Sequence, residues 1–491
     1  MAAVPSFRAL SCWESWQRCR RGGVRVPDWQ LKKHILQAAM CLLVVVAVLG
    51  AYVIWLMTWE SDTLAQNPLN MRRSAAQADI LRGSIFDAQG RALAQNRPDG
   101  SRSYPMGAAF APVTGYIGEE IGSAGIEAHA NRDLLGLTDD VSHLGPAAQL
   151  FQSARGDDVY LTIEGDAQQA AYDGLSGHRG AVVVLDADTG AVLAMASTPA
   201  YDPNNIEKQW PKLSKEGDGP LLNRAVQGLY PPGSTIKPLI ADAALREGVT
   251  DTSEVFDCTG VLDVGGGQTI RESHGEVHGK VNLQKALSES CNVTFGTLGM
   301  RLGGKKLQSA FERFGFDKDI GGEIVMTKSH LPDFANLGQG DLAQSAIGQS
   351  SLLVTPMHMA LLAAAFANEG TIMKPYLVQR VVTPGGITVR ETTPEKWLKD
   401  VTSTSQARLL DTYMEDVVKS GTGKAAAVSG VRVTGKTGTA ENAQGKDHAW
   451  FIGSAQLPGR KIAFAIIVEN SGGGGSVAAP IARKIILSLA G

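Results

Sequence analysis

Residues 450–470 read WFIGSAQLPGRKIAFAIIVEN, two apolar runs separated by Pro458-Gly459. A Pro-Gly pair between two strand-like runs marks a turn, so this stretch predicts a β-hairpin. The apolar spacing of Ala478–Leu489, near the end of the chain, predicts an amphipathic helix. Between them, Gly472–Gly475 is expected to form a flexible loop. A hairpin followed by such a helix favours a sheet with the terminal helix packed on it.

A second hairpin is predicted far upstream in the chain. The apolar runs Ala181–Leu185 and Val192–Ser197 are joined by DADTG at residues 186–190, a strong turn signal. Residues Thr235–Leu245 have helical spacing, with Pro238 tolerated in the first turn. Antiparallel strands with helices near both ends of this portion predict an α/β fold, in which a central antiparallel sheet is flanked by helices.

Composition limits the classes of protein to consider. The chain has 491 residues, 44% hydrophobic and 19% charged, so it can bury a large core and is not disordered. A net charge of −3 argues against a protein that coats nucleic acid, and we expect no nucleic-acid partner. Five scattered cysteines are too few for a disulfide scaffold.

One uncharged run predicts where the chain sits. Ala38–Met57 is long enough to cross the hydrocarbon core of a bilayer, about 30 Å thick. Residues 1–37 carry seven Lys/Arg against two acidic residues, whereas Glu60 and Asp62 follow the run, so the N-terminus is expected in the cytoplasm. A cleaved signal peptide is the weaker alternative, because the run is long and no A-x-A site follows promptly.

These features divide the chain into four predicted parts. The segment after the apolar run is polar and punctuated by glycine, with strand-like pieces at Ser84–Asp87 and Val113–Ile117, and the texture changes near residue 156. The predicted parts are a cytoplasmic tail (1–37), a transmembrane helix (38–58), a small membrane-proximal pedestal domain (59–155) and a catalytic domain (156–491).

Three short patterns outside the membrane could carry chemistry. They are S-x-x-K at Ser234–Lys237, S-x-N at Ser290–Asn292, and K-T-G-T at Lys436–Thr439. Each of the first two is weak alone, and a serine at the start of a helix is often only an N-cap. Their order, spacing and flanking residues strengthen the functional interpretation.

The residue types fit nucleophilic catalysis. Positions i and i+3 share a helix face, so Lys237 can reach the Ser234 hydroxyl, which needs a base to become a nucleophile. Lysine is a base only when its pKa is depressed by burial or by a nearby cation, and Lys436 is the candidate cation. Ser290 could relay a proton, and Asn292 could hold Lys237 and a substrate amide together. The cation and hydroxyls of the K-T-G-T segment suit a carboxylate, which predicts a serine acyltransferase acting on a peptide with a free carboxylate.

With these motifs in view, the chain resembles a class B penicillin-binding protein, a peptidoglycan D,D-transpeptidase of the serine β-lactamase and penicillin-recognising superfamily. The resemblance covers roughly residues 155–491 and a shorter N-terminal module. Companion segments typical of the family are RGSIFD at 82–87, GSAGIE at 122–127, NRA at 223–225, YPPG at 230–233, HG at 278–279, AIGQ at 346–349 and HAWFIG at 448–453.

The resemblance implies a role for each candidate residue. Ser234 would attack the penultimate carbonyl of a D-alanyl-D-alanine stem peptide, with Lys237 as base and Ser290 passing a proton to the leaving amine. Substrate binding is expected from Asn292, Lys436, Thr437, Gly438 and Thr439, and the backbone N–H groups of Ser234 and Thr439 would form the oxyanion hole. β-Lactam antibiotics would acylate the same serine. No metal or organic cofactor is implied.

A partner is also expected from the resemblance. Residues 59–155 are too few and too polar for a glycan polymerase, so the strands to be crosslinked must come from another protein. For class B enzymes that partner is a SEDS-type glycosyltransferase in the membrane. Gly50-Ala51 offers a small-residue patch for a neighbouring helix, although a merely tolerated glycine is as good an interpretation.

Several alternatives remain at this point. A β-lactamase or a β-lactam sensor shares S-x-x-K and K-T-G, but the predicted anchor, pedestal and S-x-N disfavour both, and the intact motifs disfavour a silent scaffold. The middle residue of S-x-N is Cys291 rather than the usual Asp, and whether it pairs with Cys258 in a disulfide is open.

One motif match is misleading. Gly430–Thr437 reads GVRVTGKT and fits the phosphate-binding P-loop pattern, which requires a helix directly after it. The following residues 438–445 read GTAENAQG, a poor helix former, and the predicted compartment lacks ATP. An NTPase is therefore disfavoured.

Overall fold

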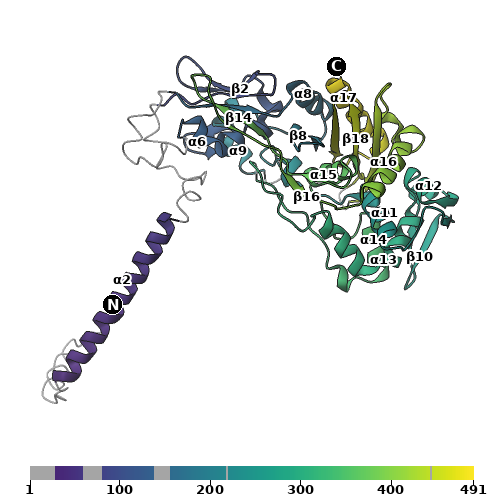
Figure 1. The fold of residues 1–491 in the computed structure, drawn as a ribbon, viewed down its shortest axis with the longest axis horizontal. Coiled ribbons are helices and arrows are strands. Elements are labelled where there is room, and N and C mark those ends of the chain that lie inside the picture. Colours follow the sequence, from purple (N-terminus) through teal and green to yellow (C-terminus); the bar gives the residue numbers. More distant parts are fainter. Residues whose placement is uncertain are drawn as a thin grey trace, which may run out of the picture. The chain divides into compact units, whose positions relative to one another are not determined.

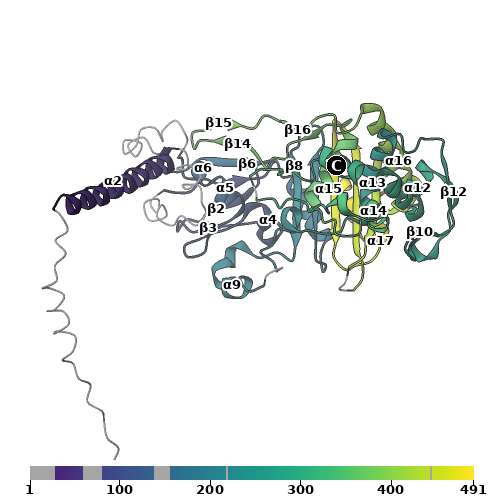
Figure 2. The same ribbon diagram turned by 90° about the horizontal axis from the view of Figure 1, so that it is seen from below.

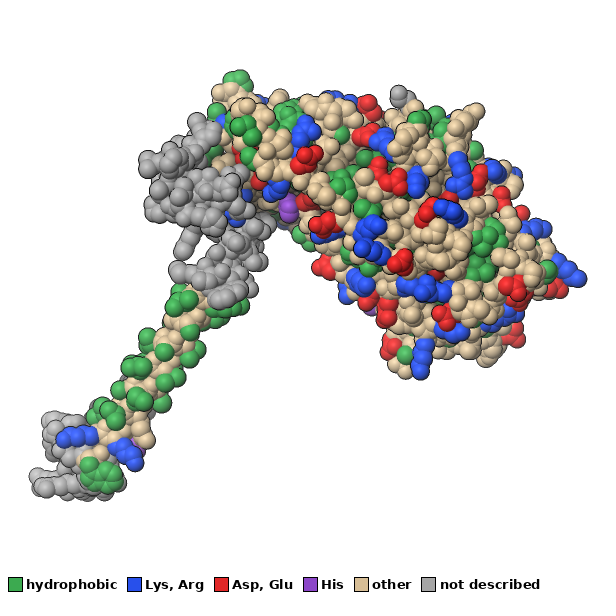
Figure 3. Space-filling model, viewed as in Figure 1, with side chains coloured by type: hydrophobic (Ala, Val, Ile, Leu, Met, Phe, Trp, Pro, Cys, Tyr) green, Lys and Arg blue, Asp and Glu red, His purple; other side chains and the backbone are tan. Residues whose placement is uncertain are grey.

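The structure is a computed structural model and describes residues 28–58, 80–137, 155–216, 219–323, 325–442 and 445–490. The chain forms two compact units, Met1–Asn70 and Met71–Gly491. The described part of the first unit is one helix, α2 (Asp28–Thr58). Its segment Lys32–Leu56 is long and apolar enough to cross a membrane, and Figure 3 shows hydrophobic side chains along it. The apolar run predicted from the sequence is therefore helical, and the predicted tail before residue 28 lies outside the described residues.

The second unit is organised around a five-stranded antiparallel sheet in the order β17-β18-β19-β7-β8 (Figure 1). Both predicted hairpins are part of it. β18 pairs with β19 and β7 with β8, while β19 also pairs with β7 and so joins the two hairpins. The strands are β7 (Gly180–Asp186), β8 (Val192–Thr198), β17 (Arg432–Ala440), β18 (His448–Leu457) and β19 (Arg460–Val468).

Helices cover both faces of this sheet, as the sequence predicted. On one face the apolar side of α17 (Gly474–Ala490) packs with α8 (Gly165–Gly174) on strand residues such as Val182 and Phe451. On the other face α15 (Pro356–Ala367) lies on β19, and α11 (Lys237–Arg246) packs against α13 (Asn292–Arg313). The remaining helices of this part are α10 (Arg224–Gln227), α12 (Leu283–Ser288), α14 (Gln339–Ala346) and α16 (Thr404–Lys419).

The terminal helix begins earlier than expected. Part of the glycine run, predicted to be a loop, forms its first turn. A Cβ atom at Gly474 would lie 2.0 Å from the Trp450 carbonyl oxygen, and one at Gly475 would lie 2.4 Å from that of Thr422. The glycines are therefore needed where the start of the helix meets the backbone of its neighbours, rather than for flexibility.

A second, six-stranded sheet has the order β15-β14-β6-β1-β2-β3 (Figure 2). Its strands come from three parts of the sequence, so segment 59–155 does not form it alone. They are β1 (Ile85–Phe86), β2 (Ala92–Asn96), β3 (Arg102–Ser103), β6 (Asp158–Leu161), β14 (Val378–Val382) and β15 (Thr388–Glu391). Three short helices follow β3 in the sequence: α4 (Ala111–Thr114), α5 (Gly125–His129) and α6 (Asn131–Leu134). A fourth, α9 (Ile206–Leu213), shares a small hydrophobic cluster with Ala111 of α4.

The predicted strand at Val113–Ile117 is wrong for most of its length. Residues Ala111–Thr114 form α4, with Pro112 in the first turn, where its fixed φ and missing N–H suit a helix. Ile117–Gly118 forms the short strand β4, which pairs with β5 (Gly122–Ser123).

Three two-stranded pairs and several single turns complete the described part. β9 (Val255–Cys258) pairs with β12 (Gly279–Asn282), and β10 (Val261–Gly265) with β11 (Gln268–Arg271). β13 (Ile372–Met373) pairs with β16 (Lys396–Leu398). The 3₁₀ turns are η1 (Gly107–Ala109), η3 (Pro203–Asn205), η4 (Gly233–Ile236), η5 (Ser273–Gly275), η6 (Phe334–Asn336) and η7 (Lys424–Ala426).

Candidate active site

Ser234 lies in the 3₁₀ turn η4, directly before α11. The turn is held on two sides. The N–H of Gly233 donates to the Gly348 carbonyl at 2.9 Å, and the Thr235 hydroxyl donates to the Pro232 carbonyl at 2.6 Å. Gly233 has φ 54°, and a Cβ atom there would lie 2.7 Å from the Thr439 carbonyl oxygen, so only glycine lets this turn pack against β17.

Lys237 is fully buried at the start of α11 and is directed to the S-x-N segment. Its Nζ donates to the Ser290 carbonyl at 2.5 Å, to Asn292 Oδ1 at 2.8 Å and to Ser290 Oγ at 3.3 Å. In the described part of the chain no hydrogen bond joins Lys237 to Ser234, although the two lie at i and i+3 as the sequence required. Burial lowers the pKa of Lys237 to about 8, and the negative charge of Glu272 opposes that shift.

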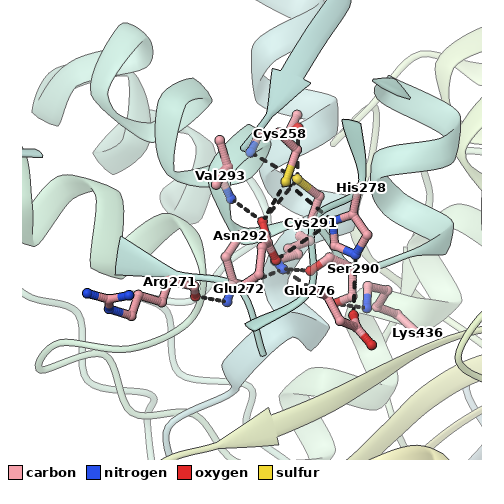
Figure 4. Close-up of polar contacts among 12 residues, drawn as sticks. Cys258, Arg271, Glu272, Glu276, His278, Ser290, Cys291, Asn292, Val293 and Lys436 are labelled. Atoms are coloured by element: carbon pink, nitrogen blue, oxygen red, sulfur yellow. Dashed lines mark hydrogen bonds and ion pairs between the residues drawn. The ribbon is translucent and has the colours of Figure 1, made fainter. Parts of the chain in front are cut away.

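Lys436 reaches the same serine from β17. Its Nζ is fully buried and donates to Ser290 Oγ at 2.8 Å and to the Thr437 carbonyl at 3.0 Å (Figure 4). Burial first, and then repulsion by Lys237, holds the pKa of Lys436 well below its usual value. The sequence left two causes open for a depressed Lys237 pKa, burial or a nearby cation such as Lys436, and in the structure burial is the main cause.

The rest of the K-T-G-T segment continues along β17, which is an edge strand of the central sheet. Thr437 Oγ1 lies 2.6 Å from Thr422 Oγ1, so two hydroxyls share one hydrogen bond. A Cβ atom at Gly438 would lie 2.8 Å from the side chain of Thr235, which explains why a glycine stands beside the nucleophile turn. Thr439 is exposed. Thr422 was missed from the sequence, because it lies in the turn after α16 without a recognisable motif.

The S-x-N segment is shaped by the start of α13. Ser290 adopts φ 62°, an uncommon left-handed conformation for a non-glycine residue. Cys291 is the N-cap of α13, and its Sγ accepts the N–H of Thr294 at 3.3 Å. The Asn292 side chain donates to the Arg271 carbonyl at 2.9 Å. The middle residue of the motif is thus buried, whereas Ser290 contacts both lysines and Asn292 contacts Lys237.

A cluster behind this segment could hold a metal ion. Cys258, Glu272, His278 and Cys291 place one donor atom each within 4.8 Å of one another (Figure 4). Two sulfurs, an imidazole and a carboxylate are donors that suit Zn²⁺. The structure has both cysteines as free thiols, so the disulfide left open by the sequence is not formed in it. Each thiol donates to Glu272 Oε1, at 3.3 Å from Cys258 and 3.1 Å from Cys291.

The fold and the site together define a class of protein. A serine in the turn before a helix, two buried lysines that meet on a second serine, and an edge strand bearing hydroxyls are the parts of an acyl-transferring serine enzyme. Residues 180–487 match the model of the penicillin-binding protein transpeptidase domain, and residues 82–157 match that of the penicillin-binding protein A dimerisation domain. The chain belongs to the penicillin-binding protein transpeptidase family, which confirms the resemblance drawn from its motifs.

Similar proteins agree with this assignment. The peptidoglycan D,D-transpeptidase PbpA of Mycolicibacterium smegmatis is 34% identical over 93% of this chain and 98% of its own length. The structure of penicillin-binding protein A from Mycobacterium tuberculosis as an imipenem acyl-enzyme complex matches with a TM-score of 0.76 and 31% identity, over 84% of this chain and 99% of that one. A D,D-transpeptidase domain from Eggerthella lenta matches with a TM-score of 0.75 and 32% identity, over 84% and 98%.

Proposed function

We propose that this protein is a peptidoglycan D,D-transpeptidase that crosslinks stem peptides through an acyl-enzyme on Ser234. The observation that carries the proposal is the meeting of Lys237 and Lys436 on Ser290, beside the turn that bears Ser234. The three motifs, separated in the sequence, form one site. The similar protein PbpA of M. smegmatis is itself named a peptidoglycan D,D-transpeptidase, which supports the proposal.

The first half-reaction transfers an acyl group to the enzyme. Ser234 attacks the penultimate carbonyl of a D-alanyl-D-alanine stem peptide, and Lys237, whose pKa of about 8 leaves part of it neutral, takes the proton. The backbone N–H groups of Ser234 and Thr439 stabilise the oxyanion. Ser290 Oγ accepts hydrogen bonds from both lysines, so its own proton is free to go to the leaving amine of D-alanine.

The second half-reaction closes the crosslink. An amine from a neighbouring stem peptide attacks the ester of Ser234, and the same groups run in reverse. Asn292 fixes Lys237 through its side-chain oxygen and orients the donor peptide. Lys436, Thr437, Gly438 and Thr439 hold the terminal carboxylate along the edge of β17. β-Lactams acylate Ser234 in the same way, as the imipenem acyl-enzyme of the M. tuberculosis protein illustrates for a relative.

The β-lactamase and sensor alternatives lose support. The match to a dimerisation domain at residues 82–157 belongs to penicillin-binding proteins, and the apolar helix fits a single-pass anchor. We place residues 1–37 in the cytoplasm and the catalytic domain outside, on the basic flank that precedes the helix. A SEDS-type glycosyltransferase in the same membrane supplies the glycan strands.

The test of the nucleophile is labelling with a fluorescent penicillin. Ser234→Ala removes one hydroxyl and should abolish covalent labelling without changing thermal unfolding. Ser176→Ala, an exposed serine after α8, is the matched control and should label like the unaltered protein. Persistent labelling of the folded Ser234→Ala protein would reject the mechanism.

A further inference from the structure

The segment Tyr230–Gly233 leads directly into the turn that bears Ser234, and its middle residues are Pro231 and Pro232. Proline has no N–H, so these two residues cannot donate a backbone hydrogen bond that would fix the segment. Tyr230 exchanges both of its backbone hydrogen bonds with Val354, at 3.0 and 2.9 Å. The placement of the rest of the segment therefore depends on the side chains around it.

Two side-chain contacts join this segment to strands of the central sheet. The Tyr230 hydroxyl donates to Oε1 of Glu469, the residue directly after β19, at 2.8 Å. Trp450 Nε1, on β18, donates to the Pro231 carbonyl at 3.1 Å. The rings of Tyr230 and Trp450 also lie edge to face, with centroids 6.2 Å apart. Because the same sheet includes β17, these contacts set the Ser234 turn against the strand that bears the K-T-G-T segment.

Glu469 is the centre of this arrangement. Besides the Tyr230 hydroxyl, it accepts Nε of Arg224 on Oε1 at 2.8 Å and Nε of Arg179 on Oε2 at 3.0 Å. The side chain of Arg224 is 1% exposed and that of Glu469 is 12% exposed. Burial alone would raise the pKa of Glu469, but the hydrogen bonds from Tyr230, Arg179 and Arg224 hold it below its usual value. The two arginines thus hold the carboxylate in place, and the carboxylate holds the phenol.

The Ser234 turn fits closely against its neighbours. A Cβ atom at Gly348 would lie 2.0 Å from the Gly233 carbonyl oxygen, and one at Gly233 would lie 2.7 Å from that of Thr439. The proposed oxyanion hole takes one N–H from Ser234 and the other from Thr439, so its geometry depends on the separation of the turn from β17. A misplacement of about 1 Å in such a site can cost roughly a hundredfold in rate.

We propose that Tyr230 and Glu469 are positioning residues for acyl transfer: their hydrogen bond fixes the segment before Ser234 relative to β17. The inference rests on the proposed role of Ser234 as the nucleophile. It assigns part of the placement of that serine to a carboxylate outside the three motifs. Both residues act through the Ser234 turn rather than on substrate.

The test is the acylation of Tyr230→Phe by a penicillin, followed by stopped flow over a range of penicillin concentrations. This measurement separates the binding constant of the non-covalent complex from the limiting rate constant of acylation. Tyr230→Phe removes one hydroxyl and keeps the ring, so the limiting rate constant should fall about tenfold, part of the loss that a larger misplacement would cause. The binding constant should not change, because Lys436 and Thr437 stay on β17. End-point labelling of Ser234 should persist.

The matched control is Tyr201→Phe. Tyr201 is also buried, and its hydroxyl donates to the Ala111 carbonyl at 3.2 Å, within the small hydrophobic cluster that includes Ile206. The loss of that hydroxyl should lower thermal stability about as much as Tyr230→Phe does, and it should leave the limiting rate constant unchanged. An unchanged limiting rate constant in folded Tyr230→Phe, or an equal fall in Tyr201→Phe, would overturn the inference.

Glu469→Leu tests the same contact from the other side. It removes the acceptor, so a further Tyr230→Phe substitution should change the limiting rate constant less than about twofold, since residues that share one contact are not additive. A full tenfold effect of Tyr230→Phe in folded Glu469→Leu would also overturn the inference. Arg224 loses its partner in this variant, and if the protein does not fold, the two tyrosine variants decide. None of these results would affect the proposed function, which fails only if folded Ser234→Ala is still labelled.

Discussion

The hydroxyl pair of Thr422 and Thr437 makes a sharp prediction about recognition of the substrate carboxylate. A threonine hydroxyl has one proton, and if Thr437 donates it to the carboxylate, it must accept from Thr422 across their 2.6 Å contact. Thr422→Val keeps the shape of the side chain and removes that donor. The Thr437 hydroxyl is then free to turn away from the ligand.

The size of the effect follows from one hydrogen bond. A net contribution of about 1 kcal/mol corresponds to roughly a fivefold loss in the second-order rate constant of acylation by a penicillin. The loss should depend on the ligand carboxylate. Stopped-flow acylation by the penicillin and by its uncharged methyl ester therefore compares the unaltered protein with Thr422→Val. The ester should react slowly with both and distinguish them little.

Thr434→Val is the matched control for this experiment. Thr434 stands on the same strand, two residues before Lys436, and shares a hydroxyl–hydroxyl contact of 2.8 Å with Ser454 of β18 instead of with Thr422 or Thr437. Removing that hydroxyl should cost a similar free energy of unfolding but leave acylation unchanged. An equal loss for acid and ester in Thr422→Val, or an equal loss in Thr434→Val, would refute the reasoning.

Three further outcomes are expected. Acylation of the unaltered protein should slow about tenfold per pH unit below the Lys237 pKa of about 8, because the neutral amine is the base; a rate that stays flat from neutral to acidic pH in folded protein would contradict this. Lys237→Arg should remain folded but fail to acylate, since arginine stays protonated, as endpoint labelling against thermal unfolding would show. Full-length protein should co-purify with a SEDS-type polymerase, whereas protein beginning near residue 80 should bind penicillin but lose the partner; equal recovery of the polymerase by both would place the interface elsewhere.

The truncation in that last experiment differs from the one the sequence alone would recommend. A cut near residue 156, the predicted start of the catalytic domain, would remove β1, whose Ile85 pairs with Val159 of β6. This pairing could not be predicted from the sequence, because the two strands are far apart along the chain and each is short. Cutting before β1 leaves the six-stranded sheet whole, so that a lost partner can be ascribed to the N-terminal segment.

The central sheet was predictable because its signals are local. Two apolar runs with a turn between them predict a hairpin, and both hairpins are confirmed. The order in which the hairpins join was not predictable, since the contact of β19 with β7 links residues far apart in the sequence. The strand predicted at Val113 failed for a local reason, because Pro112 can start a helix as readily as interrupt a strand.

In the candidate site, too, the residues in motifs could be predicted from the sequence, whereas residues that join it only through long-range contacts could not. Motif order predicted which residues should meet, and the structure brings Lys237, Ser290, Asn292 and Lys436 together, although their roles stay predictions. Thr422 and Glu272 carry no motif. Each contacts a residue that belongs to a motif: Thr422 contacts Thr437, and Glu272 accepts the N–H of Asn292. Only the folded chain creates these contacts.

Cys291, the middle residue of S-x-N, has structural contacts that the sequence did not predict. The sequence treats it as a tolerated departure, because no chemistry is assigned there. In the structure its side chain caps α13, donates to Glu272 and lies beside Cys258. The neighbouring Ser290 holds φ 62°, a conformation that must be maintained by its surroundings. The middle residue of S-x-N therefore has to fit among the buried side chains of Cys258 and Glu272. Its identity depends on these contacts, which support the Ser290–Asn292 backbone, rather than on contact with substrate.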